Sequence, residues 1–540
     1  MLIIHEKYYR IIGILFIATL LPQITLQSII DSRTSLLAKR PTPLEYDILR
    51  KEFFEEQQKN YLGSDITLSP MEERVNKILM NLKSAELKYG FDNPGNFSGA
   101  VHIFESFERI SKSQLFQIIS KMPKAGILHA HDTAMLSTEK IIEFTYRGNL
   151  WYLGDLDDTF NPPRFLFSLS KPENVNNMEW SSIADARLAI GNDSIDNKLA
   201  NLFNLYSPDP TIEHKDINFV WNRFKSMFRI LEGIVCYDQV WKAYFYQALQ
   251  EILDDGVQYL EFRGMLPNVY SINGTVYSPV QVVQLYVEVL EKFKREHPTF
   301  INAKLIFSPA RAVSDEGFQH DLQVLEELRL NYGNFVVGFD LVGQEDAGRP
   351  LKDFAHKLLQ LPSDINFFFH AGETNWNGMS SDENMIDAVI IGPKRIGHGY
   401  AILKYPKVLE VIKQKNICIE INPISNQVLK LVDDFRNHPA VHLFTQNYPV
   451  VISGDDNSFW NTKPLSHDYY ITFLAMSSSH ADLRFIEKLI MNSFTYSSLT
   501  ENEKQGALSK WRAEWEKWLS WVINNFEPEL DYVPLEEKCP

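Results

Sequence analysis

A histidine and a glutamate, residue types that can bind a metal and carry a proton, occur three positions apart at His370 and Glu373. Residues 365–369 directly before them are mostly apolar and predict a buried strand. His370 would then lie at the C-terminal end of that strand, with Glu373 on the following loop. Residues 370–373 alone are weak evidence for such a site, because a histidine after an apolar strand is more often a hydrogen-bonded core residue. It gains weight from other apolar runs that end in similar residues, at 128–132, 395–400 and 453–456.

The residues at these run ends form a candidate zinc site. His129 and His131 are two apart on a strand, so both side chains would point to the same face. His370 could supply a third nitrogen and Asp455 an oxygen. Three histidines and one aspartate, with an open position for water, are typical of a catalytic zinc ion rather than a closed structural one. Three cysteines in the whole chain leave no thiolate set for a structural zinc.

The same run ends offer residues for acid–base chemistry. Zinc lowers the pKa of a bound water toward roughly 7 and thereby supplies hydroxide at neutral pH. His398, at the end of another strand, could accept the proton of that water or orient it. Glu373 would lie across the reacting carbon and deliver a proton to a ring nitrogen, and Asp456 is free to hold the substrate. The simpler alternatives are a structural His398 and a solvated Glu373.

An α/β barrel would bring these distant residues together. Helical patterns separate most of eight apolar runs, and strands that alternate with helices indicate a parallel sheet. Eight such units predict a closed (β/α)8 barrel of the TIM type, in which the C-terminal ends of all strands meet at one mouth. The eight runs are 127–131, 257–263, 303–308, 335–340, 365–370, 395–398, 417–421 and 450–453.

The remaining segments are interpreted as additions to the barrel. Residues 28–100 read as helical and precede the first motif, so they are expected to form an N-terminal arm, with the barrel domain spanning 101–540. An inserted subdomain at about 135–215 follows the first strand, is rich in Asn, Pro and Asp, and lacks a clear strand–helix alternation. Near the C-terminus, tryptophans at helical spacing predict core packing rather than a ligand platform: Trp511, Trp515, Trp518 and Trp521.

Composition limits the class of partner. The 540 residues are 45% hydrophobic, enough for a large folded core, and carry a formal charge of −16. This charge argues against a nucleic-acid polymer, because such binding neutralises phosphates with Lys and Arg. Nucleotide substrates would need a basic phosphate pocket, and no cluster of Arg or Lys adjoins the motifs. Cys236, Cys418 and Cys539 are too few for a disulfide framework, and Cys418 is expected to be a buried free thiol.

The N-terminus predicts export from the cell. Lys7 and Arg10 precede the apolar run 11–21, which has the length of a signal-peptide core and is too short to span a bilayer comfortably. We expect a signal peptide at about 1–27 and a secreted, extracellular protein without a membrane span after cleavage; a signal anchor is the alternative. Three glycosylation sequons in polar stretches support export: Asn96, Asn192 and Asn273.

Six motifs resemble, in this order, those of the adenosine deaminases of the amidohydrolase superfamily: LHAHD, DLVGQED, HAGET, RIGHGY, NPISNQVLKL and SGDD. The similarity extends from about Val101 to about Trp521. It is closest to the secreted branch, the adenosine deaminase growth factors, also called adenosine deaminase type 2. The helical arm and the insertion after the first strand also look like that branch.

The resemblance implies a role for each matched residue. One Zn²⁺ per subunit would be bound by His129, His131, His370 and Asp455. Glu373 would donate a proton to purine N1, and His398 would handle the attacking water. The other matched positions would contact the substrate: Asp456 at N7, the backbone N–H of Gly343 at N3, and Asp132, Trp221 and His102 near the ribose.

The resemblance also implies the reaction and the partners. Adenosine, together with 2′-deoxyadenosine, would be converted to inosine and ammonia outside the cell, which would lower extracellular adenosine. The arm would contribute to a homodimer, and the branch implies growth-factor activity with a cell-surface receptor or glycan as partner. Two departures put part of this in doubt. Residues 135–215 contain no cysteine where the relatives have a disulfide, and a ribose-contacting stretch near 271–275 could not be matched.

Two rival functions differ in class from the leading one. A signalling protein could keep the fold and lose turnover, but the set of ligand and acid–base residues is complete. Another hydrolase on the same barrel could hold two metals, which would usually need a bridging lysine at the end of a middle strand. The fourth strand ends in Phe339-Asp340-Leu341 instead, which favours one metal. The chain also lacks the paired cysteines of the cytidine-type zinc deaminases.

Overall fold

The structure is a computed structural model that describes residues 40–526. The expected signal peptide at 1–27, the beginning of the arm and Cys539 lie outside the described residues. Within 40–526, no helix combines the length and the apolar character that a membrane crossing requires. The chain divides into two units, Met1–Asn60 and Tyr61–Pro540.

The described part of the first unit is a helix, α2 (Pro43–Lys59). It begins at a capping box, in which the Thr42 hydroxyl accepts a hydrogen bond from the backbone of Glu45 and the Glu45 carboxylate accepts one from the backbone of Thr42. Pro43 occupies the first helical position, where its missing N–H costs nothing. The helix buries none of its side chains within its own unit.

Eight parallel strands form the centre of the second unit, as the sequence predicts. Their bounds are β1 (Ala125–Ile127), β5 (Val257–Gly264), β6 (Asn302–Phe307), β7 (Val336–Phe339), β8 (His370–Ala371), β9 (Arg395–His398), β10 (Cys418–Ile421) and β11 (Val450–Ile452). They pair in two four-stranded sheets, in the orders β1-β5-β6-β7 and β11-β10-β9-β8. A bridge from Phe339 to Phe367 joins the sheets on one side, and a bridge from Ala130 to Asp455 joins them on the other. The strands therefore close into the expected barrel.

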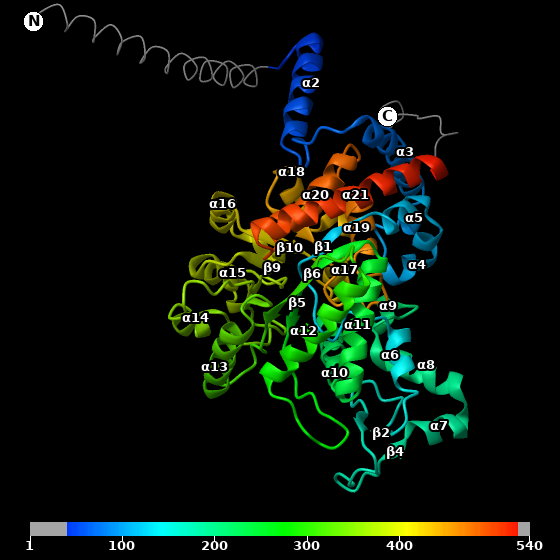
Figure 1. Cartoon of the computed structure of the whole chain (residues 1–540). Coiled ribbons are helices and arrows are strands. Elements are labelled where there is room, and N and C mark those ends of the chain that lie inside the picture. Colours follow the sequence, from blue (N-terminus) through cyan, green and yellow to red (C-terminus); the bar gives the residue numbers. More distant parts are fainter. Residues whose placement is uncertain (1–39, 527–540) are drawn as a thin grey trace, which may run out of the picture. The chain divides into compact units, whose positions relative to one another are not determined.

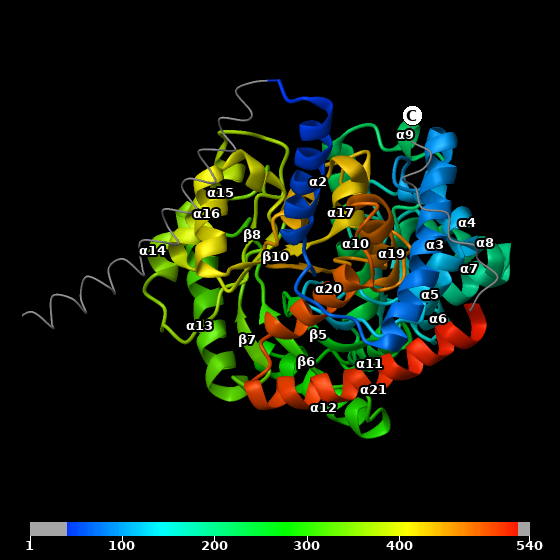
Figure 2. The same cartoon turned by 90° about the horizontal axis from the view of Figure 1, so that it is seen from above.

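Helices connect successive strands and cover the barrel from outside (Figure 2). Each buries an apolar stripe against the strands, as α12 does with Val282, Tyr286, Val289 and Phe293 at helical spacing. The connecting elements are α12 (Pro279–Glu296), α13 (Asp315–Tyr332), α14 (Lys352–Leu358), α15 (Ser380–Ile391), η2 (Tyr400–Lys404), α16 (Pro406–Lys415), α17 (Pro423–Val428), η3 (Phe435–Asn437) and α18 (Ala440–Thr445). After β11 follow α19 (Ser466–Ile471), the π-helical turn η4 (Thr472–Met476) and α20 (Leu483–Thr495).

The long connection after β1 contains a small antiparallel sheet that the sequence analysis did not anticipate. The three strands pair in the order β3-β2-β4. They are short, which weakens the alternation signal that periodicity reading depends on. The elements of this first part of the connection are α6 (Thr138–Phe144), β2 (Leu150–Leu153), β3 (Arg164–Phe167), β4 (Ser181–Ser182), α7 (Ile183–Ile190), α8 (Asn192–Phe203) and α9 (Pro210–Glu213). Two longer helices, α10 (Ile217–Val235) and α11 (Asp238–Asp254), lead back to the barrel.

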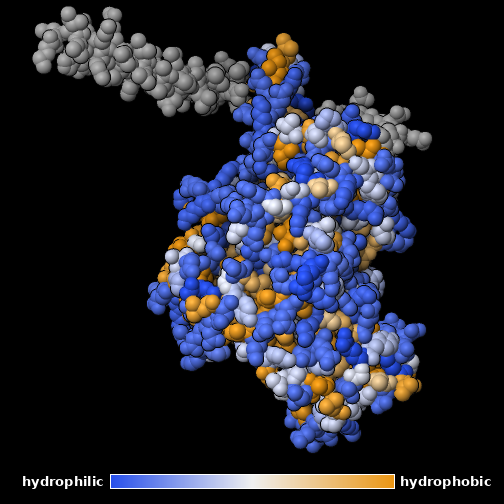
Figure 3. Space-filling model, viewed as in Figure 1, coloured by the Kyte–Doolittle hydropathy of each residue, from blue (hydrophilic) through white to orange (hydrophobic). Residues whose placement is uncertain are grey.

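The surface in Figure 3 is largely hydrophilic, with apolar side chains scattered over it, including over the inserted segment. Leu169 and Leu188 of this segment are strongly exposed. Isolated apolar residues on a surface are ordinary. The three sequon asparagines, Asn96, Asn192 and Asn273, are all exposed, as a glycan would require.

The C-terminal helix α21 (Glu501–Phe526) packs beside α20 and α3 (Pro70–Asp92) (Figure 1). Its tryptophans are core residues, as expected: Trp511, Trp515 and Trp518 are buried, and Trp521 is partly buried. Their indole N–H groups donate to the carbonyl of Pro123, the carboxylate of Glu72 and the carbonyl of Ile118, at 3.0, 2.8 and 3.1 Å. A buried tryptophan needs such a partner, so this stripe anchors α21.

The expected N-terminal arm is divided between the two units. Helix α3 buries Val75, Ile78, Leu79 and Leu82 within the second unit, where it contacts α20, α21 and α5 (Gln114–Ser120). The short turn η1 (Pro94–Asn96) and α4 (Ile103–Lys112) follow it. The apolar face of α3 is therefore already covered by the same chain. Helix α2, by contrast, has no buried residue.

Candidate active site

The chemical residues of the sequence motifs meet at the C-terminal ends of the barrel strands. His129 and His131 directly follow β1, and main-chain bridges from Ala130 to Asp455 and from His131 to Arg263 hold this segment in extended register. The two histidines therefore point the same way, as expected for residues two apart. Their ring centres lie 5.5 Å apart, and the ring centre of His370 lies 4.6 Å from that of His129.

Four of these side chains form a cluster that fits a divalent metal ion. One nitrogen from each of His129, His131 and His370 lies within 4.8 Å of the others. Asp455 Oδ1 lies 3.2 Å from both His129 Nε2 and His131 Nε2. Among residues 40–526, neither His129 Nε2 nor Asp455 Oδ1 has a hydrogen-bond partner, although both are buried. Buried polar atoms are normally satisfied, so these two atoms fit the ligand positions of a zinc ion.

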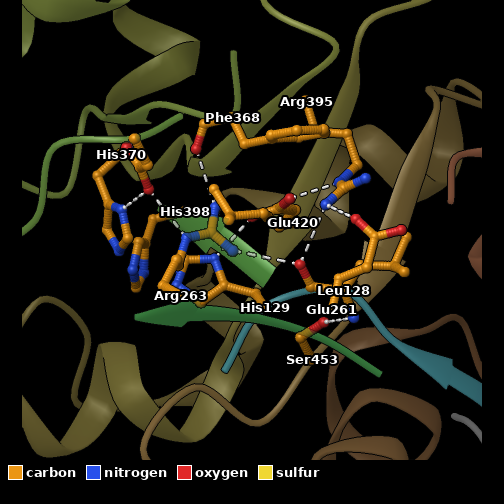
Figure 4. Close-up of polar contacts among 12 residues, drawn as sticks. Leu128, His129, Glu261, Arg263, Phe368, His370, Arg395, His398, Glu420 and Ser453 are labelled. Atoms are coloured by element: carbon orange, nitrogen blue, oxygen red, sulfur yellow. Dashed lines mark hydrogen bonds and ion pairs between the residues drawn. The ribbon is translucent and has the colours of Figure 1, made fainter. Parts of the chain in front are cut away.

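Carboxylates behind the histidines select which nitrogen faces the cluster. Glu420 Oε2 lies 2.7 Å from His129 Nδ1, and Asp340 Oδ2 lies 2.5 Å from His370 Nδ1 (Figure 4). Because Nδ1–H donates to the carboxylate in each pair, Nε2 is left unprotonated and directed at the metal position. Such pairs orient the ring and raise its basicity toward a metal.

An arginine joins these carboxylates into one buried network. Arg263 donates to Asp340 at 2.9 Å and to Glu420 at 2.7 Å, and Arg395 donates to Glu420 at 2.5 Å. All four side chains are buried, and Figure 4 shows Arg263 and Arg395 directed at Glu420. Buried carboxylates and guanidinium groups are stable only when paired in this way. The network thus holds both histidine partners ionised beneath the metal position.

Sequence reasoning assigned no role to this network, although it carries a signal. Glu420 lies inside the apolar run 417–421, and Arg263 ends the apolar run 257–263. A charged residue inside a strand that is buried on both faces needs a partner. The sequence could have marked both residues as charges within the barrel, but it could not have paired them.

Burial keeps the His370 imidazole neutral. It lowers the pKa of His370 to about 3, although the neighbouring Asp340 acts in the opposite direction. Neutral imidazole is the form that binds a metal. His370 is therefore ready to bind without losing a proton at any pH near neutrality.

Glu373 and His398 lie beside the cluster on its cavity side. His398 Nε2 is 3.6 Å from Glu373 Oε1 and 3.7 Å from Asp455 Oδ2. Both side chains are buried, so the alternative of a solvated Glu373 is wrong. Burial, reinforced by Asp455, raises the pKa of Glu373 well above its usual range. A carboxyl group in this state keeps a proton that it can donate.

The loop that carries Glu373 is fixed by another carboxylate. Glu345 accepts hydrogen bonds from the backbone N–H of Gly372 at 3.1 Å and of Glu373 at 2.8 Å. Asn384 of α15 donates to the same carboxylate at 2.6 Å. Glu345, which belongs to the DLVGQED motif, thus holds the backbone of the loop. This leaves the side chain of Glu373 directed into the cavity.

Two of the candidate site residues have a left-handed backbone conformation. His398 has φ 60° and Asp455 has φ 56°, values that side chains with a Cβ rarely adopt. Such conformations cost of the order of 1–3 kcal/mol and persist where the surrounding structure imposes them. Gly397 makes close approach possible at the same place, since a Cβ there would lie 3.0 Å from His129 Cε1. The strand ends are shaped to bring side chains together.

A cavity of about 520 Å³ opens above the cluster. This volume suits a small molecule such as a nucleoside. Helix α10 forms one wall with the aromatic side chains of Trp221, Phe224 and Phe228. The expected site residues that line the cavity are His131, His370, Asp455, Glu373, His398, Asp456, Asp132, Trp221 and Gly343.

The two additional aspartates are buried in this cavity. Burial and the neighbouring Asp455 raise the pKa of Asp456 well above its usual range, and Asp456 Oδ1 has no partner within residues 40–526. Burial raises the pKa of Asp132 to about 7, while Tyr286 donates to Asp132 Oδ2 at 3.1 Å. Both carboxyl groups therefore have hydrogen-bonding capacity left for a ligand.

His102 is placed differently from the other expected contacts. Its Nδ1 accepts a hydrogen bond from the backbone of Phe104 at 3.3 Å and so caps the first turn of α4. Its ring packs against Phe104 and His214. His102 does not occur among the cavity-lining residues, so the structure does not bring it together with the others.

No cluster of Arg or Lys adjoins the motifs along the sequence, but two basic residues reach the cavity from another part of the chain. Lys225 and Arg229 of α10 line the cavity, together with Glu232. They are exposed, and Lys225 donates to the side chain of Gln344 at 2.8 Å. Their sequence positions lie far from every motif, so adjacency along the chain could not reveal them.

Two sequence families match the chain. The family described as Adenosine deaminase matches residues 206–513, and the one described as Adenosine/AMP deaminase N-terminal matches residues 15–119. The first match covers the barrel from the end of the inserted segment to α21. The second covers α2, α3, α4 and most of α5.

Relatives are similar over nearly the whole length. An "Adenosine deaminase" of Aedes albopictus is 45% identical over 521 residues, which are 96% of this chain and 97% of the relative. An "Adenosine deaminase" of Lutzomyia longipalpis is 46% identical over 475 residues, 88% of this chain and 93% of the relative. Human "Adenosine deaminase 2" is 35% identical over 486 residues, 88% of this chain and 94% of the relative.

Solved structures share the fold at much lower identity. An Arabidopsis N6-mAMP deaminase superposes with a TM-score of 0.51 at 16% identity and covers 74% of this chain and 99% of its own. An amidohydrolase from B. ambifaria with bound Zn superposes with a TM-score of 0.51 at 14% identity and covers 76% of this chain and 95% of its own. These likenesses independently support the barrel architecture.

Proposed function

Because this chain belongs to the adenosine deaminase family, we propose that it catalyses the zinc-dependent hydrolytic deamination of adenosine and 2′-deoxyadenosine to inosine and ammonia outside the cell. One observation carries the proposal. A buried cluster of three histidines and an aspartate adjoins Glu373, a carboxyl group whose pKa is raised by burial, at a cavity of about 520 Å³. A metal site and an acid facing one apolar cavity are what hydrolysis of a purine amino group requires.

Zinc would be held by His129, His131, His370 and Asp455, and when bound it supplies the activated water for attack on purine C6. The remaining roles belong to side chains of the cavity. Glu373 delivers a proton to purine N1 on one side of the ring, and His398 handles the attacking water on the other. Both side chains are buried beside the cluster, which supports roles at the reacting centre.

Substrate recognition is proposed to use the polar groups of the cavity wall. Asp456 hydrogen-bonds purine N7, and the backbone N–H of Gly343 reaches N3. Gly343 has φ 106°, a conformation in which a side chain would be strained, and it leaves the main chain open to the cavity. Asp132 and Trp221, which line the cavity, are proposed to contact the ribose. His102 is proposed as a ribose contact on family resemblance alone.

The substrate pose makes a prediction about N7. For purified secreted protein, we expect kcat/KM for 7-deazaadenosine to be about tenfold or more below that for adenosine, because the analogue leaves buried Asp456 unpaired at a cost of roughly 1–3 kcal/mol. Asp456→Ala should narrow this gap. Loss of the adenosine absorbance measures both reactions.

Two outcomes of this assay are distinct in meaning. No conversion of adenosine by wild-type protein with full zinc would refute the proposed function. Conversion without preference between the two nucleosides would refute only the N7 contact. Asp433→Ala, a change at an exposed aspartate outside the cavity, serves as the control and should keep the wild-type ratio.

Secretion is part of the proposal. The apolar run 11–21 with its basic flank supports an exported protein, and the exposed asparagines of all three sequons support glycosylation. Removal of extracellular adenosine would then also account for growth-factor activity, with a cell-surface receptor or glycan as a further partner. The inserted segment at 135–215 has no cysteine, so a disulfide cannot stabilise it.

A homodimer is proposed through the N-terminal arm, with the exposed apolar side chains of α2 as the contact. Leu44 and Ile48 lie one turn apart on this helix and are 71% and 52% exposed. We expect the double substitution Leu44→Glu with Ile48→Glu to convert a dimer into a monomer, because it places two charges on an apolar contact face. Sedimentation velocity at micromolar concentration measures the change.

The control for the dimer lies on another side of the same helix. Arg50→Glu changes an exposed charge of α2 and should leave the dimer intact. Wild-type protein that sediments as a monomer throughout the micromolar range would contradict the proposal. All three proteins should retain deaminase activity per subunit, because α2 contributes no residue to the cavity.

A further inference from the structure

A chain of hydrogen bonds runs from the protein interior to His398 and ends on the ring nitrogen that faces away from the cavity. It involves Asn426 of α17 and His438, which follows η3. Both side chains are buried, and the chemistry described above uses neither of them. The direction of each hydrogen bond follows from the far end of the chain.

The far end is His438. The backbone N–H of Ala440 donates to His438 Nδ1 at 3.0 Å, so this nitrogen carries no hydrogen. Burial lowers the pKa of His438 to about 3, which leaves the ring neutral with a single hydrogen on Nε2. His438 Nε2 lies 2.9 Å from Asn426 Oδ1 and therefore donates to it.

This bond fixes the orientation of the Asn426 amide. With Oδ1 directed at His438, Asn426 Nδ2 faces His398 Nδ1 at 3.0 Å and donates to it. Asn422 Nδ2 approaches the same nitrogen at 3.5 Å. Because His398 Nδ1 accepts, the hydrogen of the neutral His398 ring lies on Nε2, the nitrogen that faces Glu373 and Asp455.

Neighbouring residues hold Asn426 and His438 in these positions. The ring of Tyr400 packs edge-on against His438 with 5.3 Å between ring centres, and its hydroxyl donates to the carbonyl of Leu431 at 2.7 Å. The N–H of Leu431 in turn donates to the backbone carbonyl of Asn426 at 2.8 Å. The 423–440 segment is thereby folded around the hydrogen-bond chain.

We propose that Asn426 and His438 are positioning residues that keep the ring hydrogen of His398 on Nε2, directed at the reacting atoms. The inference rests on the proposed function and deepens it. A nitrogen that carries the hydrogen donates a hydrogen bond and cannot accept a proton. His398 thus orients the attacking oxygen as a hydrogen-bond donor and does not take its proton. Zinc, when bound, would supply that oxygen as hydroxide, with its proton already released to solvent. Glu373 gives its own proton to purine N1.

The sharpest variant is Asn426→Asp. Aspartate has nearly the same shape, still accepts the hydrogen bond from His438, and can only accept from His398, which moves the ring hydrogen to Nδ1. We expect kcat to fall at least ~10-fold, toward the ~10⁴-fold loss that a wrong histidine tautomer causes in the Ser-His-Asp triad. KM for adenosine and zinc content should stay near wild type.

A second pair of variants tests the far end of the chain. His438→Ala lets the Asn426 amide turn over and should lower kcat, whereas His438→Gln offers an amide N–H to Asn426 Oδ1 and should restore much of the loss. His442→Ala is the matched control, because this exposed histidine lies four residues away on α18. Equal kcat for all three would overturn the role of His438.

A double-mutant cycle separates positioning from a structural role. Asn426→Ala should lower kcat in the wild-type background and have little further effect when His398 is already alanine. The same proportional loss in both backgrounds would overturn the proposal, since Asn426 would then act independently of His398.

A measurement without substrate distinguishes this proposal from the proposed function. In ¹⁵N-histidine-labelled protein, the signals that disappear in His398→Ala report which ring nitrogen carries the hydrogen. Hydrogen on Nε2 in wild type that moves to Nδ1 in Asn426→Asp supports the proposal, and hydrogen on Nδ1 in wild type overturns it. Absence of adenosine turnover would instead refute the deaminase assignment.

Discussion

Replacement of His370 by alanine is expected to abolish adenosine turnover and to lower the zinc content of the purified protein. The substitution removes one of three nitrogens from the cluster and leaves the buried carboxylate of Asp340 without its 2.5 Å partner. His129→Ala should do the same, because it removes a second nitrogen from the cluster and one of the partners of Glu420. Metal analysis and the absorbance assay measure the two effects separately.

The control and a graded variant make this prediction specific. His320→Ala, on the exposed side of α13, should keep both zinc and activity. Asp340→Asn keeps all four ligands but weakens the partner of His370, and loss of such a partner typically costs 10–100-fold in metal affinity or activity. Full zinc occupancy together with full activity in His370→Ala would contradict the metal assignment.

Glu373→Gln is expected to reduce kcat by at least ~10²-fold, the lower end for general acid–base catalysis. Glutamine keeps the shape of the side chain and the backbone bond to Glu345, but it has no proton to give to purine N1. Zinc should remain bound, since Glu373 is not one of the four side chains assigned to the metal. Steady-state kinetics and metal analysis on the same sample provide the measurement.

Glu410→Gln, at an exposed position of α16, is the matched control and should behave as wild type. A Glu373→Gln protein that loses zinc along with activity would show that Glu373 acts as a ligand or a structural residue. A protein with full zinc and an unchanged rate would mean that another group delivers the proton. Both outcomes are distinguishable from misfolding by thermal denaturation of the same sample.

Much of the site could be predicted because strand ends carry a strong local pattern. His370, His398 and Asp455 each follow an apolar run, and in a parallel barrel every run delivers its last residues to the same mouth. Eight such runs, separated mostly by helical patterns, sufficed for the barrel. The prediction therefore needed only the period of each segment and the rule that joins strands in order.

Partners that lie far apart in sequence could not be predicted in this way. Glu420 meets His129 across 291 positions, and Asp340 meets Arg263 across 77. Each is visible in the sequence as a charge beside an apolar run, but which charges pair depends on strand order and register around the closed barrel. The same limit hid Lys225 and Arg229, which reach the cavity from a helix that carries no motif.

The division of the N-terminal arm also depended on tertiary packing. The amphipathic pattern of α3 shows that it must bury a face, and a pattern alone does not say against what. The structure places that face on α20 and α21 of the same chain, whereas α2 has no buried residue.

By itself, the sequence determined the barrel and the residues that meet at its mouth, because both depend on residue type and on position at the end of a strand. Only the tertiary structure decided how those residues are held: which carboxylate orients each histidine, and which way the hydrogen of His398 points. Ligand identity is a local property of a motif. Orientation is set by hydrogen bonds between segments that come together only when the barrel closes.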